Sequence, residues 1–186
     1  MKIEPQDVRS VEELHCLVEQ GGRPKYLFFW GHRAKNKNLI DKSCFSNWFP
    51  AKFEIDGLKY FSTEHHMMAQ KAKLFRDEEC LQKILKASSP AEAKSLGRKV
   101  KNFSENIWLH KRFQIVVAGN LAKFSQNPDF RDFLLTTKNR ILVEASPVDK
   151  IWGIGLAADD KKIENPRLWK GLNLLGFALM EVRKQL

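Results

Sequence analysis

Apolar residues recur along this chain at spacings that change from one segment to the next. Val11, Leu14 and Val18 follow helical spacing, and Gly21-Gly22 ends that segment, which predicts a short amphipathic helix within a polar lead-in over residues 1–24. Lys25–Gly31 (KYLFFWG) is instead a continuous aromatic run, as in a buried strand. The beginning of the chain therefore predicts a helix followed by a strand.

The next segment combines aromatic residues with turn residues. Residues 32–43 (HRAKNKNLIDKS) predict a basic loop, and Cys44–Pro50 (CFSNWFP) predicts an aromatic one. Phe53–Phe61 (FEIDGLKYF) predicts an antiparallel hairpin, because Asp56-Gly57 at its centre suits a two-residue turn in which glycine tolerates positive φ.

Signals for helix starts become frequent after the hairpin. Ser62 or Thr63 is expected to cap the helix that follows. Ser89-Pro90-Ala91-Glu92 is a capping box with proline at the first helical position. Asn127-Pro128-Asp129 is expected to cap a further helix that carries Phe130, Phe133 and Leu134.

Three further elements complete the predicted fold. Ser104–Phe124 predicts one long helix, Ile141–Ala145 a short strand, and Leu172–Leu186 a closing helix. The side chains expected to face inward are Trp108, Ile115, Leu121 and Phe124 on the long helix, and Leu175, Leu179 and Val182 on the closing helix. The pattern as a whole predicts a mainly α-helical α+β single domain with a small antiparallel sheet.

Composition narrows the class of protein. The chain has 186 residues, enough for one domain with a core of its own, and it contains no apolar run of membrane-spanning length and no apolar leader of signal-peptide type. Cys16, Cys44 and Cys80 lie far apart without metal-ligand spacing, which favours a reduced, cytoplasmic protein. The formal charge of +10 favours an anionic partner such as nucleic acid or a phosphorylated metabolite, although solvated surface lysines explain the same charge equally well.

The segment Ser62–Lys71 (STEHHMMAQK) is the first candidate for chemistry. On a helix, Glu64, Met68 and Lys71 share one face, with Glu64 and Lys71 about 10 Å apart along the axis. Glu64 falls in the first turn, where the helix dipole favours an ionised carboxylate that suits base work or stabilises a developing positive charge. The competing interpretation is a surface helix on which these two charges have no special role.

Other kinds of site fit the sequence less well. His65 and His66 are adjacent and so point about 100° apart on a helix, which does not allow them to chelate one metal ion as an i, i+4 pair does. Gly153 and Gly155 follow a strand, but the third glycine and the long helix of a dinucleotide fold are missing, as are a phosphate-binding loop and a nucleophile elbow. We therefore expect no metal and no cofactor.

Two loops combine aromatic and polar residues in a way that suits a planar ligand. Asp149–Gly155 (DKIWGIG) places a carboxylate before Trp152 and two glycines, which allows backbone approach while an indole stacks on a ring. Phe45-Ser46-Asn47-Trp48 places an amide with donors and an acceptor beside aromatic rings. Taken alone, a tryptophan such as Trp152 is more often a core residue than one that stacks on a base.

Five segments in order along the chain resemble the NADAR domain family, the YbiA-like N-glycosidases. They are FSNWFP at 45–50, STEHHMMAQK at 62–71, LGR at 96–98, DKIWGIGL at 149–156 and NLLGFALMEVR at 173–183. The resemblance runs from about residue 26 to the end, which predicts a YbiA-like domain over residues 25–186 after a lead-in over residues 1–24. It implies hydrolysis of an N-glycosidic bond, either in phosphorylated aminopyrimidine intermediates of riboflavin biosynthesis or between ADP-ribose and guanine.

The resemblance also implies roles for particular residues. The family's acidic residue after Ser/Thr falls on Glu64, its Gln-Lys pair on Gln70 and Lys71, and its Arg after Leu-Gly on Arg98. The loop acid and indole fall on Asp149 and Trp152, but some bacterial members have WGDG where this chain has Ile154, so a role for that extra Asp is absent here.

Ribosyl C–N cleavage passes through an oxocarbenium-like state, which a carboxylate stabilises or attacks through an activated water. We therefore expect Glu64, Asp149 and Lys71 to be catalytic, with Lys71 acting as an electrostatic partner or attacking C1′ to form a Schiff base. Phosphate contacts are expected from Arg98, Lys99 or Lys101. The expected substrate-binding residues are Asn47, Trp48, Gln70, Arg98, Trp152 and Gly153.

The sequence leaves several alternatives open. A non-catalytic binder of ADP-ribose or nucleic acid fits the charge and the aromatic loops, whereas nothing in the sequence favours a purely structural role. The expected partner is a small phosphorylated ribosyl-base substrate, with ADP-ribosylated nucleic acid as the second choice and no membrane. The catalytic hypothesis expects Glu64 and Asp149 to face one cleft, and the sequence carries no information on oligomeric state.

Overall fold

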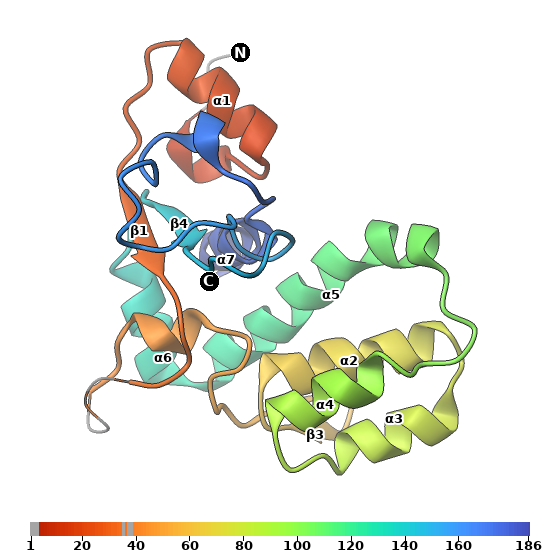
Figure 1. The fold of residues 1–186 in the computed structure, drawn as a ribbon. Coiled ribbons are helices and arrows are strands. Elements are labelled where there is room, and N and C mark those ends of the chain that lie inside the picture. The colour runs from red at the N-terminus through yellow and green to blue at the C-terminus, as the bar shows by residue number, and fades with distance from the viewer. Residues whose placement is uncertain (1–3, 35, 37–38) are drawn as a thin grey trace. The chain divides into compact units, whose positions relative to one another are not determined.

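A computed structural model describes residues 4–34, 36 and 39–186 of the chain (Figure 1). The fold is α+β and mainly helical, and the chain divides into two compact units, residues 1–46 with 129–186 and residues 47–128. Part of the predicted basic loop, at 35 and 37–38, lies outside the described residues.

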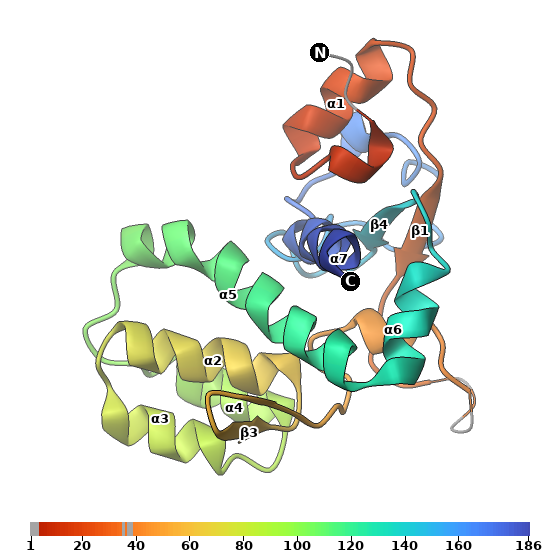
Figure 2. The same cartoon turned by 180° about the vertical axis from the view of Figure 1, so that it is seen from behind.

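The first unit is built around a parallel pair of strands. β1 (Tyr26–Phe29) pairs with β4 (Ile141–Glu144), so that Tyr26 lies opposite Ile141. The helix α7 (Leu174–Gln185) packs against β4, as both views show (Figures 1 and 2). The remaining elements of this unit are η1 (Pro5–Asp7), α1 (Val11–Glu19), η2 (Lys42–Phe45), α6 (Pro128–Leu135, which begins at the unit boundary) and η3 (Pro166–Leu168).

The second unit places one helix at its centre. α2 (Thr63–Leu74) packs against α3 (Glu78–Leu85), α4 (Pro90–Gly97) and α5 (Glu105–Gln126). The hairpin β2 (Phe53–Ile55) and β3 (Leu58–Tyr60) precedes α2. Because neighbours surround α2, even its polar residues at positions 63–66 are buried.

Local rules in the sequence account for most element boundaries. Asp56 (φ 52°) and Gly57 (φ 76°) both have positive φ, as the two-residue hairpin turn requires. The side chain of Ser62 accepts from the backbone of His65 and caps α2, and Ser89 caps α4 with proline at the next position. Glu92 reaches back to the backbone N–H of Ser88, one residue before the cap, so the capping box is displaced by one residue.

The predicted fold class is confirmed, with two differences in detail. The hairpin is antiparallel as expected, but β1 and β4 form a second, parallel pair that the sequence did not predict. On α5, Phe124 is fully buried as expected, whereas Trp108, Ile115 and Leu121 are only half-buried. The ridge that α5 buries instead contains Val116, Val117, Gly119, Asn120, Lys123 and Phe124.

Candidate functional site

The first turn of α2 is held by a network of polar contacts. Besides accepting from the backbone of His65, the Ser62 hydroxyl lies 2.8 Å from Nδ1 of the His65 ring, whose Nε2 lies 3.1 Å from the carbonyl of Ala87. A carbonyl only accepts, so Nε2 carries the proton and the hydroxyl donates to Nδ1. Burial lowers the pKa of His65, which keeps the ring neutral in this structural role.

Glu64 lies in this first turn and is buried, with 2% of its surface exposed. Its backbone N–H donates to the carbonyl of Asn47 at 2.9 Å, which joins the aromatic loop to the start of α2. The interpretation of this segment as an exposed surface helix is therefore wrong. A carboxylate in the first turn of a buried helix is the arrangement that the catalytic interpretation needs.

Lys71 lies two turns further along α2 and joins two of the sequence motifs. Its Nζ donates to the carbonyl of Gly97 at 2.9 Å, and lies 4.1 Å from the ring centroid of Phe103 and 5.6 Å from that of Trp108. Burial lowers the pKa of Lys71, which favours the neutral amine. A Cβ at Gly97 would overlap the side chain of Met68, so glycine allows α4 to approach α2 at this point.

Other predicted binding residues of this unit lie around α2 and α4. The ring of Trp48 lies 5.5 Å from Nζ of Lys94, a cation–π contact. Gln70 lies near Tyr60: burial raises the pKa of Tyr60, and the side chain of Gln70 lowers it. The Tyr60 hydroxyl makes no hydrogen bond within normal distance in the described structure. Arg98 is exposed at the C-cap of α4.

The two predicted phosphate-binding lysines share a small pocket of about 170 Å³. Lys101 there pairs with Glu79 at 3.0 Å, as Lys83 does at 2.7 Å. These contacts hold the pKa of Glu79 down at about 2. Among the described residues of this pocket, Lys99 is the lysine without a carboxylate partner, so it is the better phosphate candidate of the two.

Asp149, Trp152 and Gly153 lie in the first unit, in an irregular loop after β4. Oδ1 of Asp149 accepts from the backbone of Ile151 and of Trp152, each at 2.8 Å, so this carboxylate shapes its own loop. A Cβ at Gly153 would lie 2.8 Å from the carbonyl oxygen of Glu144, which is too close for any other residue. Trp152 is half-buried.

Ile154 lies at the position where this chain departs from the WGDG pattern. Its side chain is fully buried in the core of the first unit. The position therefore contributes to packing in this chain.

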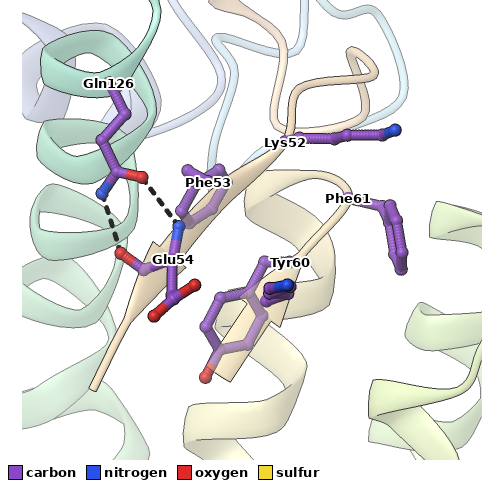
Figure 3. A pocket seen from close by; sticks show the side chains of 7 residues that line it. Lys52, Phe53, Glu54, Tyr60, Phe61 and Gln126 are labelled. Carbon is purple, nitrogen blue, oxygen red and sulfur yellow. Dashed lines mark hydrogen bonds between the residues drawn. The ribbon is translucent and has the colours of Figure 1, made fainter. Parts of the chain in front are cut away.

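The hairpin carries a pocket that contains none of the predicted site residues (Figure 3). It has a volume of about 410 Å³ and is lined by Lys52, Phe53, Glu54, Lys59, Tyr60, Phe61 and Gln126. Figure 3 shows the Gln126 amide pairing with the backbone of Glu54, where it accepts at 2.9 Å and donates at 2.8 Å. The Gln126 amide thus makes the two backbone hydrogen bonds that a neighbouring strand would make, so α5 covers the edge of β2. A buried carboxylate, Glu64, and a half-buried lysine, Lys71, lie instead on one helix, α2.

The described residues contain neither a metal-binding cluster nor a membrane-spanning helix. No group of three His, Cys, Asp or Glu side chains there is arranged to hold a metal ion. Burial lowers the pKa of His66 to about 4, so this ring is neutral at physiological pH. No helix of the described chain has the length and apolar character needed to cross a membrane.

The structure also identifies contacts around Asn47 and Lys71 that the sequence did not predict. Asn120 on α5 bonds to Asn47, and the rings of Phe103 and Trp108 cover Lys71. Asn120 had a signal in the sequence, because it lies four residues from both Val116 and Phe124 and so belongs to the buried ridge of α5. A polar residue within an apolar ridge is expected to have a bonding partner.

Comparison with known proteins identifies the family of this chain. The NADAR domain model matches residues 28–186. The chain belongs to the NADAR family. It is 46% identical to N-glycosidase R617 of Acanthamoeba polyphaga mimivirus over 87% of this chain and 96% of that protein. It is 39% identical to protein irg-1 of Caenorhabditis elegans, over 80% of this chain and 78% of the relative.

Bacterial members of the family are similar in sequence and in structure. N-glycosidase YbiA of Escherichia coli is 34% identical over 78% of this chain and 82% of the relative. The NMR structure of the E. coli protein YbiA matches with a TM-score of 0.67 and 26% identity, covering 100% of this chain and 92% of that one. The expected YbiA-like fold is confirmed.

Proposed function

We propose that this protein is a hydrolase that cleaves the bond between ribose and the base nitrogen of a phosphorylated nucleotide-like substrate. The names of relatives, N-glycosidase R617 and N-glycosidase YbiA, support hydrolysis of N-glycosyl bonds as the reaction class. The observation that carries the proposal is the buried Glu64 in the first turn of α2, with the half-buried Lys71 two turns later.

In this proposal Glu64 acts on the ribosyl cation. As the C–N bond breaks, positive charge develops on the sugar, and an adjacent carboxylate stabilises it or removes a proton from the attacking water. Asp149 is proposed as the second catalytic carboxylate, although its Oδ1 also closes its own loop. Substrate contacts are proposed for Asn47, Trp48, Gln70, Arg98, Trp152 and Gly153.

The substrate classes favoured are the aminopyrimidine ribosyl phosphates of riboflavin biosynthesis and ADP-ribose linked to guanine. Both present the same ribosyl C–N bond, which is the part that Glu64 and Lys71 are proposed to act on. The formal charge of +10 supports an anionic substrate of either kind. A cytoplasmic location belongs to this proposal.

Substitution of the two carboxylates tests the proposal. Glu64→Gln and Asp149→Asn each preserve shape and remove charge, and we expect release of free base to fall by about 10²–10⁴-fold. Matched controls are Glu92→Gln, in the first turn of α4, and Asp160→Asn, whose Oδ1 closes a similar exposed turn at 2.8 Å. Turnover close to wild type in both site variants would refute the assignment. Binding of ADP-ribose without release of base from any substrate would favour the non-catalytic alternative.

Two roles for Lys71 give different results on trapping with borohydride. As a nucleophile, the neutral amine attacks C1′ while the C–N bond breaks and the base leaves with a proton. The ring then opens to an imine, which water hydrolyses to free the sugar and the amine. Borohydride reduces that imine to a stable secondary amine, visible as added sugar mass on the peptide containing Lys71. An electrostatic role predicts no such adduct.

A further inference from the structure

Two buried asparagine amides, those of Asn120 and Asn47, are hydrogen-bonded to each other beside the start of α2. Asn120 on α5 is fully buried, and its Nδ2 donates to the carbonyl of Val116 at 3.0 Å and to Oδ1 of Asn47 at 3.1 Å. Oδ1 of Asn120 lies 3.4 Å from the hydroxyl of Thr63, a longer and weaker contact. Asn120 therefore joins α5 to the aromatic loop and to the first turn of α2.

These contacts determine which way each amide points. The carbonyl of Val116 only accepts, so the Asn120 atom facing it must be the NH₂ group. The second hydrogen of that NH₂ points at Asn47, so the Asn47 atom that receives it must be the oxygen. The opposite orientation of Asn47 would place two NH₂ groups against each other in a buried position.

The fixed orientation leaves the donor end of Asn47 available. Its backbone carbonyl accepts from Glu64, and its Oδ1 accepts from Asn120. In the described part of the chain no hydrogen bond leaves Nδ2 of Asn47, and the residue retains 5% exposure. Nδ2 of Asn47 thus has two unused hydrogens beside the turn that carries Glu64.

We propose that Asn120 is a positioning residue that fixes the Asn47 amide with its NH₂ group toward the substrate, so that this position selects for an acceptor oxygen. The inference rests on the proposed N-glycosidase function, because it takes the region beside Glu64 as the sugar and base site. The acceptor is then a ribose hydroxyl oxygen or a carbonyl oxygen of the base. A substrate with only a donor at this position is rejected, because two donors would face each other.

Steady-state kinetics of base release test the inference through a double-mutant cycle. Asn47→Ala is expected to raise KM by about tenfold, the loss of one hydrogen bond, with kcat changed much less. Asn120→Ala is expected to raise KM in the wild-type background but to have almost no further effect in the Asn47→Ala background, because it acts through Asn47. Asn47→Asp keeps the acceptor for Asn120 but presents an acceptor to the substrate, and should raise KM at least as much as Asn47→Ala.

Two kinetic results would overturn the inference. One is an equal effect of Asn120→Ala on KM in both backgrounds, which indicates a structural role only. The other is an unchanged KM in Asn47→Ala and Asn47→Asp. Thr63→Val is the matched control, because it removes only the long 3.4 Å contact and should leave KM within about twofold of wild type. If wild type releases no base from any substrate, the proposed function fails. The orientation of the Asn47 amide is then decided by a measurement on the folded protein that needs no turnover.

That measurement is NMR of the side-chain NH₂ groups in the wild-type protein, which also applies if the Asn120 variants do not fold. The NH₂ of Asn120 is expected to exchange slowly with water, and that of Asn47 faster. The Asn47 signal should shift when ribose 5-phosphate or 5-aminouracil is added, but not with inorganic phosphate. A shift with the sugar phosphate assigns the acceptor to ribose, and a shift with 5-aminouracil assigns it to the base. No shift with either probe would overturn the inference.

Discussion

The aromatic rings over Lys71 make a prediction about its pKa. Burial lowers this pKa, whereas the Phe103 ring face, 4.1 Å from Nζ, stabilises the ammonium form and so acts in the opposite direction. Phe103→Leu keeps an apolar side chain at the position and removes the ring face. The charged form then loses stabilisation, and the pKa of Lys71 should fall further.

The structure sets the size of this shift. Phe103 is 44% exposed, so the contact belongs at the weaker end of the range for cation–π interactions, about 0.5–1 kcal/mol. At about 1.36 kcal/mol per pH unit, the expected fall in pKa is about 0.4–0.7 units. Trp108 lies further away, 5.6 Å from Nζ, and retains part of the stabilisation.

The assay is a pH titration of protein labelled at lysine Cε, followed by ¹³C NMR, with Lys71→Arg identifying the signal. Phe61→Leu is the matched control, because Phe61 is a phenylalanine of similar exposure (50%) that contacts His65 and should leave the titration of Lys71 unchanged. An unchanged or raised pKa in Phe103→Leu would refute the reasoning, since it would mean that the ring mainly excludes water. If Lys71 is the nucleophile, kcat/KM near neutral pH should also rise by about 2–5-fold, in proportion to the neutral fraction.

Three further predictions concern stability, each measured by chemical or thermal unfolding. Gly119→Ala should lower the free energy of unfolding by about 1–3 kcal/mol, because the new Cβ would meet the rigid ring of His66, whereas alanine at an open helical position stabilises by about 0.5–1 kcal/mol. Adding His66→Ala should relieve this cost. Additive losses in the double variant would contradict the prediction. The pKa of His66 is about 4 in the folded protein and 6.5 in the unfolded chain, so the free energy of unfolding should fall by on the order of 3 kcal/mol as the pH drops from 6.5 to about 4. His66→Leu should flatten this pH dependence, and an unchanged slope in that variant would refute the prediction. Ser89→Ala removes the cap of α4 and should cost about 1 kcal/mol, whereas the adjacent Ser88→Ala is the comparison that should cost less.

Sequence reasoning succeeded where a local rule decides the structure. The turn at Asp56-Gly57, the caps at Ser62 and Ser89, and the buried stripe of α7 follow from residues that are neighbours in the chain. The parallel pairing of β1 with β4 depends on strands that are far apart in sequence. No local signal specifies such a pairing, which explains why it was not predicted.

Burial of polar residues was the harder part of the site to predict. The polar run Thr63–His66 has no apolar stripe, so spacing alone suggested an exposed face, whereas four neighbouring elements bury it. Asn120 lies within an apolar ridge, but its role depends on Asn47 and Thr63, which are distant in sequence. Glu64 and Lys71 were identified by motif and spacing, but the contacts of Lys71 with Gly97 and Phe103 required the structure.

The central claim is that this chain hydrolyses a ribosyl C–N bond with Glu64. The most direct measurement incubates the wild-type protein and Glu64→Gln with an aminopyrimidine ribosyl phosphate and with ADP-ribosylated guanine, and quantifies free base and free sugar phosphate together. We expect equal amounts of base and sugar from at least one substrate with wild type, and a loss of about 10²–10⁴-fold in Glu64→Gln. Release at the same rate by both proteins, or no release by wild type from either substrate, would contradict it.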